Sequence, residues 1–89
     1  MKMKLFDFTE KSVIVTGGGT GIGLEISKLF IDCGAKVTIV GRREEILEKA
    51  LSEITKSRPE LNDNVIILTC DMANEDSVNK LFKTVKSTF

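Results

Sequence analysis

The sequence predicts an α/β fold in which three parallel strands alternate with three helices. Apolar periodicity changes three times from short runs rich in β-branched residues to helical spacing, and a glycine-rich turn follows the first run. Strands that alternate with helices of this length need right-handed crossovers and a parallel sheet. We therefore expect a βαβαβα half of a doubly wound sheet, with strand order 3-2-1.

The first unit contains a strand at Ser12–Thr16, the glycine turn and a helix that runs to about Cys33. Gly34 is expected to cap this helix, because glycine readily adopts the positive φ of a helix C-terminus. Apolar residues in the helix recur at spacings of three and four, which predicts one buried face. That face is expected to contain Ile22, Ile26, Leu29, Phe30 and Cys33.

The second unit has a strand at residues 36–40 and a helix at about 43–56, followed by a polar surface connection at 57–64 that contains Pro59. The buried stripe of this helix is expected to contain Ile46, Leu47, Ala50, Leu51 and Ile54.

The third unit has a strand at residues 65–70 and a helix that Asn74 caps, with acidic residues in its first turn. The apolar face of this helix is expected to contain Val78, Leu81, Phe82 and Val85.

Length and composition favour one small soluble domain over residues 1–89, since a chain of this size buries roughly 60–65% of its unfolded surface. Thirteen basic and thirteen acidic residues balance, which argues against a nucleic-acid partner. No apolar run approaches the roughly 20 residues that span a bilayer, so we expect no membrane partner and a cytoplasmic chain.

Cys33 and Cys70 lie far apart and the chain has no His. Both cysteines are therefore expected to be small buried hydrophobes, and no metal site is expected.

The glycine turn reads Thr16-Gly17-Gly18-Gly19-Thr20-Gly21-Ile22-Gly23. Glycines permit positive φ and close approach of a ligand, and the helix that follows offers unpaired N–H groups to a pyrophosphate. A purely structural turn is the alternative. The G-x-G-x-x-G pattern fails in each register, because Ile22 or Leu24 takes the third glycine position, and no Lys-Ser or Lys-Thr follows as a P-loop requires.

The spacing T-G-x-x-x-G-I-G resembles the cofactor motif of the short-chain dehydrogenase/reductase family, whose fold is of the Rossmann type. The resemblance covers the whole chain: Leu5-Phe6-Asp7-Phe8-Thr9 precedes the motif, an Arg follows the second strand and an Asp follows the third. The chain corresponds to the N-terminal third of family members.

The resemblance implies a role for each position of the turn. Gly17 would make the tight turn, Gly21 would let the backbone approach the diphosphate, and Gly23 would let the helix pack closely on the strand. Ile22 would line the nicotinamide side of the cofactor. Gly19 and Thr20 belong to the same cofactor-binding loop.

The end of the second strand indicates NADP rather than NAD. An acidic residue there accepts hydrogen bonds from the ribose 2′-hydroxyl, but this chain has Gly41. Arg42 matches the family position that pairs with the 2′-phosphate, and Arg43 follows it. The alternative is that both arginines are only solvated at a helix start, although cations there oppose the helix dipole.

Asp71 and Met72 resemble the family residues that contact adenine, the first through its carboxylate and the second through its backbone. Their place after a strand agrees with ligand binding at carboxyl ends of strands. Asp71 as a plain turn residue is the alternative.

The resemblance implies an oxidoreductase that moves hydride between NADPH and a carbonyl or alcohol of a small molecule, an enzyme of the EC 1.1.1 type that forms a homo-oligomer. The family's catalytic Ser, Tyr and Lys cannot be assigned, because the chain contains no Tyr and ends before the relevant segments. The 89 residues alone are therefore expected to be inactive. A non-catalytic nucleotide-binding or interaction module with the same fold is the alternative, and the open edge of the first strand is expected to make the isolated chain dimerise or aggregate.

Overall fold

The computed structural model describes residues 9–17 and 19–89, so residues 5–8 of the family resemblance lie outside the described part. The elements in chain order are β1 (Ser12–Thr16), α1 (Gly21–Asp32), β2 (Lys36–Gly41), α2 (Glu44–Ser57), a 3-10 helix η1 (Pro59–Asn64), β3 (Val65–Thr69) and α3 (Glu75–Thr88). The bounds of the three strands and of α1, α2 and α3 agree with the sequence-based ones to within two residues, whereas the segment expected to be an irregular surface connection contains η1. Among the described residues, no helix combines the length and apolar character needed to cross a membrane.

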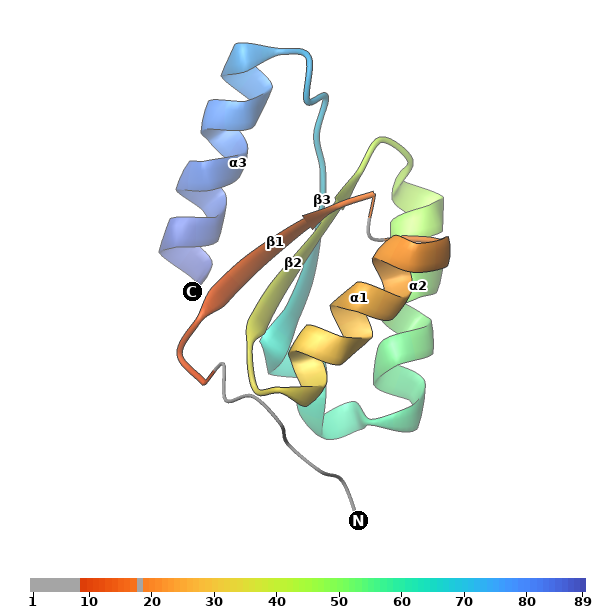
Figure 1. Cartoon of the computed structure of the whole chain (residues 1–89). Helices are drawn as coiled ribbons and strands as arrows, with labels where there is room; N and C mark the ends of the chain where they lie inside the picture. The colour runs from red at the N-terminus through yellow and green to blue at the C-terminus, as the bar shows by residue number, and fades with distance from the viewer. Residues whose placement is uncertain (1–8, 18) are drawn as a thin grey trace.

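The three strands form one parallel sheet with β2 in the centre, which confirms the predicted order 3-2-1. Val37 of β2 lies opposite Val13 of β1 and Val65 of β3. Helices α1 and α2 cover one face of the sheet, and α3 lies over the other (Figure 1). The arrangement is therefore half of a doubly wound sheet, in which β1 lies at one edge of the described strands.

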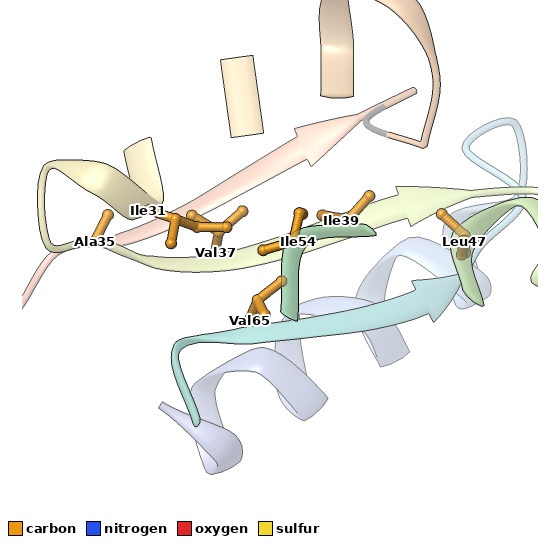
Figure 2. Packing of buried hydrophobic residues seen from close by; sticks show 7 residues of the cluster. All are labelled: Ile31, Ala35, Val37, Ile39, Leu47, Ile54 and Val65. Atoms are coloured by element: carbon orange, nitrogen blue, oxygen red, sulfur yellow. The ribbon is translucent and has the colours of Figure 1, made fainter. Parts of the chain in front are cut away.

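The core lies on both faces of β2, whose side chains alternate between them. Val37 and Ile39 point toward α1 and α2, where they join the larger cluster shown in Figure 2. Val40 points the other way and contacts the side that α3 covers. Burying each of these side chains contributes about 1.5–3 kcal/mol. The central strand is thus held by apolar contacts from both sides. The larger cluster contains Ile31, Ala35, Val37, Ile39, Leu47, Ile54 and Val65, and the smaller contains Val40, Cys70, Leu81 and Val85.

The buried face predicted for α1 is wrong at Ile22, Ile26 and Leu29, whereas Cys33 is buried and Phe30 packs against the larger cluster as predicted. Ile22 is 80% exposed, Leu29 is 62% exposed and Ile26 is also exposed, whereas Ser27 and Ile31 are buried. Helix α1 carries apolar residues on more than one side, so spacing alone did not select the contact face.

The buried face of α1 includes a small polar residue, Ser27. Gly23 and Ser27 lie one turn apart, and the buried Ser27 hydroxyl donates to the Gly23 carbonyl oxygen at 2.9 Å. Ile22 and Ile26 each precede one of these residues and are therefore turned by about 100° away from them. The close packing expected at Gly23 is the signal that could have given the correct face.

The remaining helix predictions hold with one exception. In α2, Leu47, Ala50 and Ile54 are buried, as the stripe predicted. In α3, Leu81 and Val85 are buried, but Phe82 is exposed because the contact of α3 with the sheet is confined to the smaller cluster.

The predicted caps and cysteine environments are confirmed. Asn74 accepts a hydrogen bond from the Ser77 N–H at the start of α3, and Gly34 ends α1 with a φ of 93°. Cys33 and Cys70 are both free and buried.

An ion pair joins the two helices on the same face of the sheet. Lys28 Nζ of α1 lies 2.9 Å from Glu53 Oε2 of α2. This hydrogen bond with Glu53 raises the pKa of Lys28, and the charge of Glu25 adds to the effect. The pair is partly exposed, so it contributes little to the free energy of unfolding.

Thr38 provides a direct test of packing on the α3 side of β2. Its side chain is fully buried, and its hydroxyl has no hydrogen-bond partner within the described part of the chain. Because an unpaired buried hydroxyl costs free energy, Thr38→Val is expected to raise the free energy of unfolding by about 1 kcal/mol. Chemical denaturation measures this change.

Thr38→Ser is the matched control. It keeps the hydroxyl and removes a methyl group, so it is expected to lower the free energy of unfolding by about 1 kcal/mol. If Thr38→Val instead lowered the free energy of unfolding, the Thr38 hydroxyl would have a hydrogen-bond partner, and the expectation would be wrong.

Candidate functional site

The candidate site lies at the carboxyl edge of the sheet, where loops from all three strands are held together. The Gly17 N–H, just after β1, donates to the Val40 carbonyl oxygen at 2.8 Å. The Cys70 N–H, just after β3, donates to the Gly41 carbonyl oxygen at 3.0 Å. The glycine turn, the end of β2 and the loop after β3 are therefore fixed relative to one another.

Two glycines of the turn face open space. Gly17 has a φ of 67° and Gly21 a φ of 54°, values that side-chain-bearing residues rarely adopt. A Cβ added at either position would meet no atom of the described residues within 4 Å. These positions thus combine a backbone that requires glycine with room for a ligand to approach.

Gly19 serves packing. A Cβ there would lie 3.0 Å from Ile46 Cγ2 and 3.5 Å from Leu47 Cδ2 of α2. The absence of a side chain at Gly19 therefore lets the turn lie directly against α2.

The start of α1 is open to an anion. Thr20 is its N-cap residue, yet the described residues give α1 neither a side-chain cap hydrogen bond nor an acid in its first turn. Helix α3 differs, because Asn74 caps it and Glu75 and Asp76 follow. The first N–H groups and the positive dipole end of α1 are thus available to an anionic group. Ile22 lies exposed beside them.

The end of β2 carries two cations. Arg42 is 77% exposed, and its Nη2 lies 3.5 Å from Asp71 Oδ1. Arg43 is exposed and is the N-cap residue of α2. An ion pair as exposed as that of Arg42 contributes about 0–1 kcal/mol, so the guanidinium can exchange Asp71 for another anion at little cost.

Gly41 leaves no acid at the end of β2. A Cβ at this position would lie 3.2 Å from Cδ2 of Leu47, which is buried. A larger side chain there would require Leu47 to move.

A pocket of about 430 Å³ lies between the ends of β2 and β3, a size typical of small-molecule sites. Asp71 presents its carboxylate there, with Oδ1 accepting a hydrogen bond from the Ala73 N–H at 3.0 Å. Met72 is the next residue and is 48% exposed. The pocket is lined by Arg42, Thr69, Cys70, Asp71 and Ser77.

The fold brings Arg42 and Asp71 together and places the glycine turn on the same edge of the sheet. Sequence reasoning missed Thr69 and Ser77 as pocket residues. Ser77 is three residues after the Asn74 cap, a position where a side chain can reach back toward the preceding loop, and this spacing could have drawn attention to it.

A parallel sheet with a glycine turn and a basic strand end at its carboxyl edge is typical of nucleotide-binding α/β proteins. The chain belongs to the short-chain dehydrogenase family, whose model matches residues 11–89.

Known proteins resemble the chain in sequence and in structure. An uncharacterized oxidoreductase of Staphylococcus aureus (strain USA300) is 35% identical over 81 residues, which are 91% of this chain and 32% of that protein. Menthone neomenthol reductase from Mentha piperita superposes with a TM-score of 0.85 and 32% identity, over 91% of this chain and 28% of that one.

An NADPH-bound short chain oxidoreductase of Pseudomonas aeruginosa PAO1 gives a TM-score of 0.86 with 28% identity, over 94% of this chain and 32% of that one. The chain thus spans about a third of the length of such proteins.

The open space above Gly21 can be tested by substitution. Gly21→Ala is expected to lower the free energy of unfolding by about 1–2 kcal/mol, because alanine is strained at positive φ. It is also expected to weaken NADPH binding by a further 1–3 kcal/mol or so, since the methyl group enters the space above the turn. Denaturation and calorimetric titration measure the two effects separately.

Gly34→Ala is the matched control, because Gly34 also has a positive φ but lies at the C-terminus of α1. It should lower the free energy of unfolding by a similar amount and leave the affinity for NADPH unchanged. Equal losses of NADPH affinity in the two variants would contradict a ligand role for the space above Gly21.

Proposed function

We propose that residues 1–89 form one NAD(P)-binding domain of an NADP-dependent short-chain oxidoreductase. The observation that carries the proposal is the end of β2, where Arg42 stands exposed and Gly41 replaces an acid. A guanidinium matches the geometry of a phosphate, whereas an acid at Gly41 would repel the 2′-phosphate. This combination favours NADPH over NADH.

The turn residues would hold the diphosphate. The open space above Gly17 and Gly21 and the uncapped start of α1 support this assignment. Gly19, Thr20 and Gly23 shape the same turn, and Ile22 would lie on the nicotinamide side.

The remaining site residues would bind the adenosine half of the cofactor. Arg42, with Arg43 beside it, would take the 2′-phosphate. Asp71 would accept a hydrogen bond from the adenine amino group, and the backbone of Met72 would contact the ring. The pocket at the ends of β2 and β3 supports this assignment, because its lining includes both a cation, Arg42, and an acceptor, Asp71.

The nicotinamide cofactor would supply or accept hydride in a reaction at a carbonyl or alcohol carbon. An NADPH-bound relative and a menthone neomenthol reductase among the structural neighbours support a reaction of the EC 1.1.1 type on a small molecule. We assign no catalytic residue to this chain, and we expect the 89 residues alone to be inactive. A complete protein of this kind would be a cytoplasmic homo-oligomer.

A non-catalytic nucleotide-binding module with the same fold is the second candidate, since the open glycine turn and the exposed Arg42 are features of binding in either case. It would bind NADPH with the same residues. The two candidates differ in turnover, since only the oxidoreductase would oxidise NADPH in the presence of a carbonyl substrate.

The role of Arg42 is tested by comparing two cofactors. Arg42→Ala is expected to weaken NADPH more than NADH by about 1.5–3 kcal/mol, because a charge-assisted hydrogen bond to the 2′-phosphate is lost. Arg42→Lys keeps the charge without the planar fork and should give an intermediate loss. Calorimetric titration of both cofactors measures the difference.

Lys49→Ala provides the control, because it removes an exposed cation from α2 outside the pocket. Both affinities should stay unchanged in that variant. Equal weakening of NADPH and NADH by Arg42→Ala would refute the 2′-phosphate role.

A further inference from the structure

The Ser77 side chain connects the first turn of α3 to the end of β3. Its hydroxyl donates to Cys70 Sγ at 3.4 Å and accepts a hydrogen bond from the Asp71 N–H at 3.1 Å. Its own N–H donates to Asn74 Oδ1 at 2.9 Å. One hydroxyl therefore contacts both residues at which the chain leaves the sheet.

These contacts bear on the direction of the Asp71 carboxylate. The Asp71 carbonyl oxygen accepts a hydrogen bond from the Asn74 N–H at 3.0 Å, which closes the loop back on itself. Oδ1 accepts from the Ala73 N–H and lies 3.5 Å from Arg42 Nη2. Both contacts use the same oxygen, so Oδ2 is the atom that the described residues leave to a ligand.

Cys70, which accepts the hydrogen bond from Ser77, is a buried residue of the core. It is 6% exposed and belongs to the cluster under α3, whereas the side chain of Asp71 is 57% exposed. The Ser77 hydroxyl therefore ties an exposed loop to a buried, well-packed point. Without it, the Asp71 N–H would lose its acceptor, and the carboxylate would be directed by the loop alone.

We propose that Ser77 is a positioning residue of the nucleotide pocket, which aims the Asp71 carboxylate at the adenine amino group. The inference rests on the proposed function, because it needs Asp71 to contact adenine. Ser77 acts on the part of the ligand that NADPH and NADH share. Loss of the Ser77 hydroxyl therefore lowers the affinities for NADPH and NADH equally, whereas loss of the Arg42 side chain lowers mainly the affinity for NADPH.

The test is a double-substitution cycle in the purified protein, with the Kd of NADPH measured by calorimetric titration. Ser77→Ala is expected to weaken NADPH about three- to tenfold, as for one lost hydrogen bond. In an Asp71→Ala background the same substitution should change the Kd less than about twofold, because residues that act through one contact are not additive. Ser77→Thr keeps the hydroxyl and should restore the Kd.

Ser87→Ala is the matched control, since Ser87 lies on the same helix and its hydroxyl donates to the Thr84 carbonyl oxygen at 3.2 Å, away from the loop after β3. It should leave the Kd unchanged. Equal losses from Ser77→Ala in the two backgrounds, or no loss in the wild-type background, would overturn the inference and leave the proposed function standing. A wild-type protein that binds neither NADPH nor NADH would overturn the proposed function, and the inference would fall with it.

Discussion

Two backbone hydrogen bonds to the end of β2 determine where everything else at the carboxyl edge can lie. The Gly17 N–H binds the Val40 carbonyl and the Cys70 N–H binds the Gly41 carbonyl. They are effective because β2 is packed on both faces: its side chains are buried on one face under α1 and α2, and on the other under α3. The rigidity of the site thus comes from the core, and the loops that carry its chemistry are short extensions of the strands.

The two sides of this edge differ in their chemistry. The uncapped start of α1 and the side chain of Arg42 offer positive charge, whereas Asp71 offers an acceptor. A ligand with phosphates at one end and an amino-bearing ring at the other would match both parts, which is the physical basis for proposing a dinucleotide. The exposed Arg42–Asp71 pair is weak enough to be replaced by such a ligand.

The strands and their order followed from the sequence because β-branched runs and parallel crossovers leave few choices. The same topology explains why residues as far apart as Gly17, Arg42 and Asp71 could be assigned to one edge before any contact was known. The buried face of α1 could not be predicted from apolar spacing, because it combines the buried Ser27 with Ile31, while Ile22 and Ile26 are exposed. Ser77 was missed for another reason: its spacing from the Asn74 cap suggests a side chain that reaches back, but its partners, six and seven residues earlier, depend on the path of the loop.

The most direct test of the account is a titration of the isotope-labelled protein with NADPH, followed by the chemical shifts of its backbone amides. We predict that the largest changes occur in the glycine turn at residues 17–23, at Arg42 and Arg43, and at Asp71 and Met72, while amides at the opposite edge, such as Gly34, change little. Saturable changes centred away from the carboxyl edge, or no changes at all, would contradict the central claim that this edge is a dinucleotide site.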